Sequence, residues 1–284
     1  MGEQDLADAA LVILGHGTTM NSESAAPVLL HVAELRRRRF FAEVREAFWK
    51  QPPQIKEVLA DISARRIFIV PMFISEGYFS DEVIPKELGF GPATQESVRV
   101  QRREAQVLIY CNPVGTHPSM TNVLLARAKE VVEKFPFPRA PLPKDTTLFI
   151  AGHGTERNSN SRKPVELQVE LIRAKNLYAD VQAVFMEEEP RINAIHQLAQ
   201  TKNIVVVPFF ISDGLHVRED IPVMLGAPAR IVKKRLEEGQ PPWRNPTEIK
   251  DRLIWFAPSV GSAPQMVEVI LERVREGARA QLAT

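Results

Sequence analysis

Cysteine is almost missing from this sequence, and its scarcity limits the metal chemistry that the chain can perform. Cys111 is the single cysteine among 284 residues. An intrachain disulfide, a zinc site built from four cysteines and a cysteine-held iron–sulfur cluster are therefore excluded. Any metal that this chain binds must be held by histidine and carboxylate side chains.

An excess of charge of one sign is also missing. The sequence has 36 lysine and arginine residues against 35 aspartate and glutamate residues, so no global field favours nucleic acid or an anionic membrane as a partner. The opening segment, MGEQDLADAALVIL, has acids where a secretory signal needs lysine or arginine, and its apolar run is too short to span a bilayer. We expect a cytoplasmic protein with neither a nucleic-acid nor a membrane partner, and the sequence leaves its oligomeric state open.

An internal repeat is the strongest feature that is present. LGHGTTMNSESAAP (14–27) is echoed by AGHGTERNSNSRKP (151–164), with an offset of 137 residues between His16 and His153. The same offset relates IFIVPMFISEGYFSDEVIP (67–85) to IVVVPFFISDGLHVREDIP (204–222) without a gap. A third pair, PVGTHPSM (113–120) and PSVGSAPQM (258–266), has a slightly larger offset. Separate blocks in a shared register indicate a tandem duplication.

The two copies meet at a proline-rich segment, FPFPRAPLPKD (135–145). Its four prolines cannot propagate a helix or a central strand, so we interpret the segment as a linker. A boundary near residue 140 predicts an N-terminal lobe at 1–140 and a C-terminal lobe at 141–284. Each lobe is long enough to bury a core.

Each copy alternates short β-branched apolar runs with amphipathic stretches, which is the pattern of βαβ units around a parallel sheet. The expected strands are 10–14, 44–49, 67–74 and 106–110 in the first copy, and 147–151, 181–186, 204–211 and 253–256 in the second. The helices expected in the second copy are 163–175, 190–201, a short one after residue 217, and 264–280. The predicted fold class is α/β, with two similar doubly wound parallel-sheet lobes facing a central cleft.

Three side chains of the second copy are expected to meet at one edge of its sheet. His153, Glu187 and His216 follow the first, second and third strands of that copy. Ligands of parallel α/β sheets bind beyond the carboxyl ends of the strands, where these loops gather. Two imidazoles and a carboxylate suit borderline divalent ions such as ferrous iron, cobalt, nickel and zinc, and they leave coordination positions open. We predict these three residues as metal ligands and catalytic groups.

The aligned positions in the first copy are His16, Lys50 and Phe79. Only the first histidine is kept, and an ammonium beside it would repel a cation. The second copy is therefore expected to be the reacting half, and the first copy to supply the opposite wall. His16 is expected to contact the substrate there.

These motifs resemble those of the sirohydrochlorin chelatase family. The resemblance is carried by GHGT after a strand, by VPFFISDGLHVREDIP (207–222) and by PVGTHPSM, and it covers nearly the whole chain in two copies. It implies the class II chelatase fold and a metal chelatase, a lyase, that inserts cobalt or ferrous iron into the tetrapyrrole sirohydrochlorin in cobalamin or siroheme biosynthesis. The metal is then a substrate, and no organic cofactor is expected. The metal-binding histidines of the family correspond to His153 and His216, and its glutamate to Glu187.

The expected chemistry agrees with this resemblance. Metal insertion expels two protons from the inner nitrogens of the ring, and histidine suits a base that works near neutral pH. Sirohydrochlorin carries carboxylates around its rim, so local donors must bind it. The loop and first helical turn after GHG supply hydroxyl, amide and guanidinium donors together with free backbone N–H groups. The predicted substrate contacts are Thr155, Asn158, Ser159, Ser161 and Arg162, with His117 beside the opening of the last helix of the first copy.

Simpler roles compete for several of these residues. A histidine flanked by glycines also suits a tight strand-to-helix turn, and Glu187 begins an acidic run that is favourable before a helix. His31 and His196 sit on helical patterns typical of partly buried residues, and Cys111 is expected to be a buried small residue. The stretch 226–252 is the main insertion of the second copy. It is interpreted either as a lid, in which Trp243 would stack on the macrocycle, or as a surface loop.

Three other functions compete with that of a sirohydrochlorin chelatase. A ferrochelatase acting on protoporphyrin shares the fold, but polar donors after GHGT argue against its more apolar substrate. A carrier of tetrapyrrole or metal would bind its cargo and release it unchanged. Nucleotide binding is disfavoured, because neither first strand is followed by G-x-G-x-x-G or a P-loop.

Overall fold

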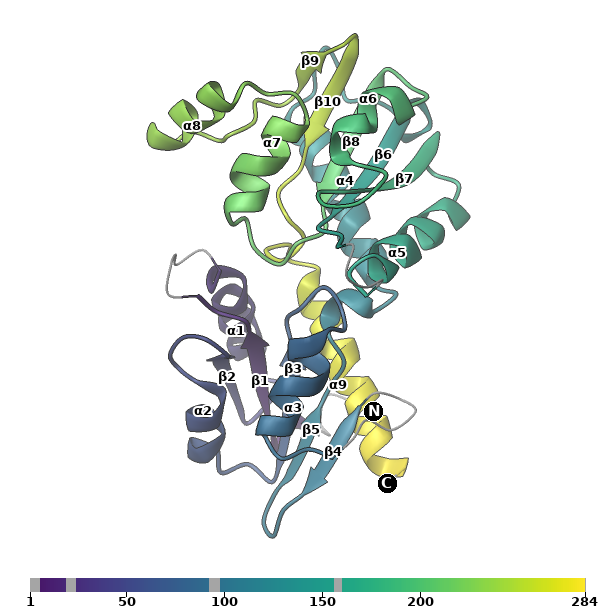
Figure 1. Cartoon of the computed structure of the whole chain (residues 1–284). Coiled ribbons are helices and arrows are strands. Elements are labelled where there is room, and N and C mark those ends of the chain that lie inside the picture. The colour runs from purple at the N-terminus through teal and green to yellow at the C-terminus, as the bar shows by residue number, and fades with distance from the viewer. Residues whose placement is uncertain (1–5, 19–23, 92–97, 156–159, 284) are drawn as a thin grey trace. The chain divides into compact units, whose positions relative to one another are not determined.

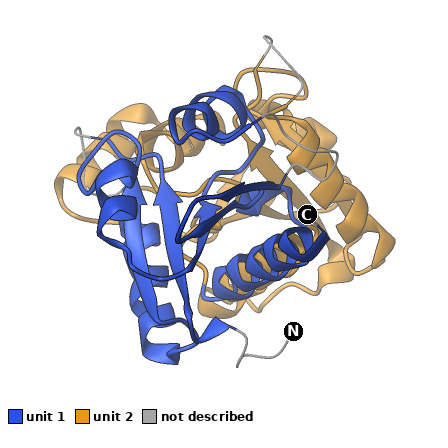
Figure 2. Cartoon of the chain, turned by 90° about the horizontal axis from the view of Figure 1, so that it is seen from below, with its two compact units in different colours: residues 1–117, 264–284 blue, residues 118–263 orange. Residues whose placement is uncertain are grey.

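The structure is a computed structural model that describes residues 6–18, 24–91, 98–155 and 160–283. The chain forms two compact units, which we call unit 1 (residues 1–117 and 264–284) and unit 2 (residues 118–263), as Figure 2 shows. Each unit has one sheet with helices packed on it, and Figure 1 labels the elements of both. In the described part of the chain, no helix has the length and apolar character needed to cross a membrane.

The sheet of unit 1 has parallel strands at its centre and an antiparallel strand at one edge. Its strands lie in the order β2 (Glu43–Phe48), β1 (Ala9–Gly15), β3 (Arg66–Pro71), β5 (Val107–Tyr110) and β4 (Arg99–Arg102), and only β4 is antiparallel to its neighbour. Every residue of β1 is buried, as expected for a central strand with both faces covered. The helices of unit 1 are α1 (Ala26–Arg38), α2 (Ile55–Asp61), a π-helical segment (Tyr78–Val83) that continues into α3 (Ile84–Glu87), and α9 (Met266–Ala283).

Unit 2 repeats this topology strand for strand. The order is β7 (Asp180–Phe185), β6 (Thr146–Gly152), β8 (Asn203–Pro208), β10 (Arg252–Phe256) and β9 (Thr247–Ile249), with β9 antiparallel at the edge. Its helices are α4 (Met120–Lys134), α5 (Lys163–Ala174), α6 (Ile195–Leu198), a π-helical segment (His216–Asp220), α7 (Ile221–Met224) and α8 (Ala229–Glu237).

The α/β fold class predicted from the sequence is confirmed, and the expected parallel strands are present in both units. Two differences concern local structure. The antiparallel edge strands β4 and β9 are not predicted, because they are short and polar. The helix expected at 190–201 is only a 3-10 turn, Ile192–Ala194, followed by α6.

The last helix of each sequence copy belongs to the other unit. Helix α4 comes from the first copy but packs on β8, β10 and α5 of unit 2, whereas α9 comes from the second copy and packs on β3 and β5 of unit 1. The packing of α9 is close: a Cβ atom on Gly277 would lie 2.9 Å from the Sγ atom of Cys111. The compact units therefore differ from the predicted lobes 1–140 and 141–284 by an exchange of helices. An amphipathic pattern specifies that a helix has an apolar face, but not which sheet covers it.

A buried arginine ties each exchanged helix to the loop that it covers. Arg127 of α4 donates to the carbonyl of Ser259 (2.9 Å) and to the hydroxyl of Ser262 (2.7 Å) in unit 2. Arg273 of α9 donates from Nε (3.0 Å) and Nη2 (2.7 Å) to the carbonyl of Pro113 in unit 1. These hydrogen bonds satisfy loop carbonyls that the strands cannot reach.

The insertion at 226–252 contributes to the core of unit 2. It contains α8 and the edge strand β9, and Trp243 within it is only 5% exposed. The indole of Trp243 packs against Phe256, with ring centroids 6.2 Å apart, and donates to the carbonyl of Ile254 at 3.3 Å. The expectation that Trp243 stacks on a macrocycle is therefore wrong, because its ring is enclosed by the unit's own core.

Candidate metal centre

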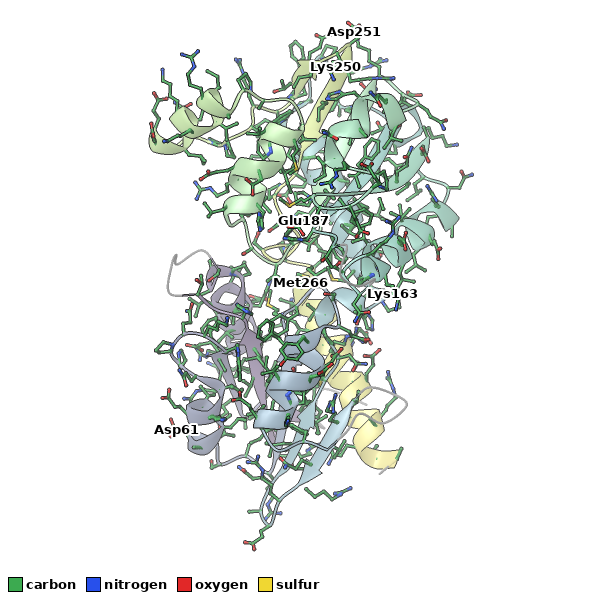
Figure 3. All side chains as sticks on the ribbon, viewed as in Figure 1. Asp61, Lys163, Glu187, Lys250, Asp251 and Met266 are labelled. Atoms are coloured by element: carbon green, nitrogen blue, oxygen red, sulfur yellow. The ribbon has the colours of Figure 1, made fainter. Side chains whose placement is uncertain are left out.

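Three predicted residues meet at the carboxyl ends of neighbouring strands in unit 2. His153 directly follows β6, Glu187 follows β7, and His216 opens the π-helical segment after β8. The strands β7, β6 and β8 are adjacent and parallel, so their loops emerge at one sheet edge. Glu187 is labelled in Figure 3, where it lies at this end of the unit.

The three side chains form two adjoining pairs that share His153. Its ring lies 5.1 Å from the ring of His216, centroid to centroid, at an interplanar angle of 79°. Its Nε2 atom lies 3.8 Å from Oε1 of Glu187. The exposed fractions are 40% for the His153 side chain, 56% for Glu187 and 50% for His216, so an ion from solvent can reach all three. In the ranges that the structure describes, no three His, Cys, Asp or Glu side chains, these three included, are grouped closely enough to hold a metal ion.

Both histidines have their Nδ1 atoms engaged by the protein. Nδ1 of His153 lies 2.8 Å from the carbonyl oxygen of Gly154, and Nδ1 of His216 lies 2.7 Å from Oδ2 of Asp220. Both partners accept hydrogen bonds, so a neutral ring places its proton on Nδ1 and its lone pair on Nε2. Histidines that bind metals are commonly oriented in this way by a carbonyl or a carboxylate. In a neutral ring of this kind, the Nε2 lone pair of each histidine is not used by the hydrogen bond at Nδ1.

The turn that carries His153 depends on a glycine and a glutamate. Gly154 has φ +70°, a left-handed conformation that favours glycine, and a Cβ atom there would lie 2.7 Å from Oε1 of Glu188. The same carboxylate oxygen accepts a hydrogen bond from the backbone N–H of Thr155 at 3.2 Å. Glu188 in turn pairs with Arg162 at 3.3 Å. These contacts fix the loop after β6 to the loop after β7.

The loop that leads to His216 is held by the segment after β10. The backbone N–H of Ser259 donates to Oδ1 of Asp213 at 2.8 Å, and that of Gly261 donates to the carbonyl of Phe210 at 3.2 Å. A Cβ atom on Gly261 would lie 1.6 Å from the carbonyl oxygen of Ile211. The glycine of the third repeated motif is therefore required by the close approach of two backbones.

The predicted substrate contacts fall into different surroundings. Thr155 and Ser161 flank the His153 loop, and the Ser161 hydroxyl is buried without a hydrogen-bond partner among the described residues. The guanidinium of Arg162 contacts Glu166 at 2.6 Å as well as Glu188, so it helps to order the loops. Asn158 and Ser159 lie outside the described residues.

His117 lies in unit 1, where it is held by α9. Its Nε2 atom is 3.3 Å from Oε1 of Glu276, and its side chain is only 12% exposed. This contact favours a role in docking α9, and a substrate contact by His117 stays a prediction. His31 and Cys111 are both buried, as expected, and burial raises the pKa of the Cys111 thiol to about 12.

Unit 1 presents different side chains at the equivalent edge. Nδ1 of His16 lies 2.9 Å from the carbonyl oxygen of Gly17, which repeats the contact between His153 and Gly154. Lys50 and Phe79 lie beside it, with the Lys50 Nζ atom 5.3 Å from the centroid of the Phe79 ring. The two sheet edges therefore share a backbone arrangement but not a ligand set.

Sequence reasoning missed Asp220 and Glu188. Asp220 is four residues after His216 in HVRED, and this spacing places two side chains on one face of a helix. That spacing is the signal that could have identified it. Glu188 stands next to Glu187 in an acidic run, and the sequence alone does not indicate which of the two faces the histidine loop.

The two sheets, with histidines at the carboxyl ends of their strands, define a protein of the class II chelatase fold. The family model CbiX matches residues 10–131 and 147–277. These ranges cover most of the chain, and it belongs to the CbiX family.

Individual relatives support this assignment. A protein named "Probable sirohydrochlorin cobaltochelatase" from Halobacterium salinarum is 38% identical over 278 residues, which covers 94% of this chain and 91% of the relative. The sirohydrochlorin cobaltochelatase of Methanopyrus kandleri is 27% identical over 149 residues, covering 45% of this chain and 94% of that protein. The second match has about the length of one copy, which agrees with the tandem duplication.

Solved structures give the same fold. A multi-domain protein from Deinococcus radiodurans, described as structurally similar to chelatases, has a TM-score of 0.75 and 26% identity. The match covers 95% of this chain and 55% of that one, so this chain spans about half of its length. SirB from Bacillus subtilis, solved with Fe³⁺, has a TM-score of 0.67 at 16% identity over 96% of this chain and 97% of SirB.

Proposed function

We propose that this protein is a sirohydrochlorin chelatase, an enzyme that inserts cobalt or ferrous iron into the ring of sirohydrochlorin. Its family and its relative of nearly equal length support this assignment. The observation that carries it is the pair of imidazoles at the unit 2 edge, His153 and His216, whose Nδ1 atoms are both engaged and whose Nε2 atoms are left for a cation.

The two Nε2 atoms would bind the incoming divalent ion, and Glu187 would lie next to it. Imidazole and carboxylate suit both cobalt and ferrous iron. Because the side chains are half exposed, coordination positions stay open for the nitrogens of the ring. A metal that must be handed on needs such an open site, in contrast to a closed structural zinc site.

Insertion exchanges two protons of the ring for one divalent ion. As the metal–nitrogen bonds form, each pyrrole N–H proton must pass to a base. Glu187 lies 3.8 Å from Nε2 of His153 and 56% of its side chain is exposed, so its carboxylate can accept a proton and release it to solvent. Thr155, next to the His153 loop, would bind a rim carboxylate, and Arg162, which pairs with Glu166 and Glu188, would hold that loop in place.

The test is metal insertion in a purified system. The protein is incubated anaerobically with sirohydrochlorin and, separately, with cobalt, ferrous iron, nickel or zinc, and the absorbance change is compared with the protein-free rate. A chelatase accelerates insertion of cobalt or ferrous iron. Binding of sirohydrochlorin without acceleration would instead identify a carrier. A parallel reaction uses protoporphyrin in place of sirohydrochlorin, and turnover of protoporphyrin alone would identify a ferrochelatase for that ring.

Histidine variants locate the reaction in unit 2. We expect His153→Ala and His216→Ala each to lower the insertion rate by at least about tenfold while the far-UV circular dichroism spectrum is retained. The double variant should be less than additive, because both side chains serve one step. Wild-type turnover in either single variant would remove that histidine from the site.

A further inference from the structure

The equivalent sheet edge of unit 1 has the same backbone arrangement as the candidate metal centre of unit 2, but its side chains differ in charge and in their ability to bind a metal. The backbone N–H of Lys50 donates to the carbonyl of His16 at 2.9 Å, and that of Glu187 donates to the carbonyl of His153 at 3.1 Å. Lys50 therefore occupies the place of Glu187 and exchanges a negative charge for a positive one. Phe79 likewise occupies the place of His216, and the preceding residue is Tyr78 where unit 2 has Leu215.

These side chains form one continuous cluster, which we call the aromatic edge and define as His16, Lys50, Tyr78 and Phe79. The Phe79 ring lies 5.5 Å from the ring of His16, edge to face at 83°, and 5.7 Å from the ring of Tyr78. The Lys50 ammonium lies 5.3 Å from the Phe79 centroid, within cation–π range. Phe79 therefore contacts both a cation and a second aromatic ring.

The aromatic edge is exposed to solvent. Tyr78 is 66% exposed and Phe79 is 39% exposed, although aromatic side chains usually bury most of their surface. Among the residues that the structure describes, Lys50 is exposed and forms no ion pair with a carboxylate. Its charge is therefore available to an anion from solution.

This edge does not suit a metal ion. Of the three positions that would supply ligands, only His16 can coordinate, and the ammonium of Lys50 would repel a divalent cation across a few ångströms. An exposed ammonium beside exposed aromatic rings instead matches a flat ring with anionic groups on its rim. Aromatic faces supply offset stacking, and the ammonium pairs with a carboxylate.

We propose that the aromatic edge of unit 1 is a metal-free binding site for a planar tetrapyrrole that carries carboxylates. The Tyr78 and Phe79 rings are inclined at 67° to each other, so one stacks on the macrocycle while the other contacts it edge to face, and Lys50 pairs with a carboxylate on its rim. This inference rests on the proposed function for the identity of the ligand. It adds that the two copies have divided their roles, with unit 2 binding the metal and unit 1 binding the macrocycle.

Binding of metal-free sirohydrochlorin to the full chain tests the proposal directly. The dissociation constant is measured by absorbance titration for the wild type, Tyr78→Ala, Phe79→Leu and Lys50→Glu. We expect each variant to weaken binding by about three- to tenfold, the range for the loss of one stacking or charge contact. Phe79→Leu keeps an apolar side chain in place, so its effect reports on stacking and not on a collapse of the edge.

Matched controls lie in the segment that joins the sequence copies. Phe137→Ala removes an exposed aromatic ring, and Lys144→Glu reverses an exposed lysine. Both controls should bind sirohydrochlorin as the wild type does. If they weaken binding as much as the aromatic-edge variants do, the effect is a general loss of apolar or positive surface and the proposal is overturned.

Two further readouts separate this proposal from the proposed function. Cobalt affinity without macrocycle should be unchanged in Tyr78→Ala, which adds no metal ligand to the edge. In insertion assays of the variants, KM should rise with kcat within about twofold of the wild type, as expected when uniform binding is lost. Wild-type KM and wild-type sirohydrochlorin binding in all three variants would overturn the proposed binding site at the aromatic edge, while the proposed chelatase function would stand. Weakened binding in a protein whose wild type inserts no metal would support the aromatic edge and overturn the chelatase. A wild type that does not bind sirohydrochlorin overturns both.

Discussion

Replacement of Asp220 by asparagine tests how the proposed metal ligand His216 is oriented. Oδ2 of Asp220 accepts the hydrogen bond from Nδ1 of His216 at 2.7 Å, and this contact leaves the lone pair of a neutral ring on Nε2, the atom that we propose binds the metal. An asparagine can turn its amide N–H toward Nδ1, which would shift the ring proton to Nε2 and block coordination. We therefore expect both cobalt affinity and insertion rate to fall.

The expected size of the effect follows from the exposure of the pair. Loss of a carboxylate that orients a metal-binding histidine costs about 10- to 100-fold in affinity or activity. About half of each side chain is exposed, 50% for His216 and 47% for Asp220, and solvent screening favours the lower end. The estimate is therefore about tenfold, or about 1.4 kcal/mol.

The assay is equilibrium dialysis with cobalt, followed by insertion kinetics at saturating sirohydrochlorin. The matched control is Glu219→Gln, which removes the same charge from the adjacent exposed residue. Wild-type affinity and rate in Asp220→Asn would refute the reasoning. An equal loss in Glu219→Gln would show that local charge matters and the hydrogen bond does not.

Three further outcomes follow from the structure. His16→Ala should reduce the insertion rate less than His153→Ala, by under about threefold against at least about tenfold, because His16 lacks neighbouring ligands; equal losses would contradict the division between the units. Gly261→Ala should lower the free energy of unfolding by about 2–4 kcal/mol in urea titrations, since its Cβ atom would lie 1.6 Å from the Ile211 carbonyl oxygen; unchanged stability would argue against this close approach. Burial opposes ionisation of Glu276, but the His117 hydrogen bond and the charge of Arg273 lower its pKa to about 2 from 4.5. The ionised carboxylate therefore adds to the free energy of unfolding above pH 4.5, and this contribution is lost as the pH falls through about 2. Glu276→Gln should cost about 1–2 kcal/mol at pH 7 and progressively less as the pH falls through 2; a pH-independent difference would refute the linkage.

The repeat made most of the fold predictable. Buried parallel strands read as apolar runs, and β1 and β6 were identifiable because both of their faces are covered. The exchange of α4 and α9 was not predictable, since an apolar helix face does not specify its partner sheet. The edge strand β9 has only three residues, too few for an alternating pattern to be recognised.

The site was partly predictable for a related reason. Strand order brings His153, Glu187 and His216 to one sheet edge, so their neighbourhood follows from topology alone. The orienting role of Asp220 depends on a side-chain hydrogen bond within a π-helical segment, and a carboxylate in a polar surface stretch is usually just solvated. Trp243 was misinterpreted because an aromatic residue in an insertion resembles an exposed one until its core contacts are known.

The most direct test of this account is a crystal structure of the protein soaked with cobalt, with the ion located by its anomalous signal. We predict a cobalt ion in unit 2, about 2.0–2.2 Å from the Nε2 atoms of His153 and His216, with Glu187 beside it. The aromatic edge of unit 1 should hold no cobalt. An ion on Nε2 of His16, with none between His153 and His216, would contradict the assignment of metal binding to unit 2.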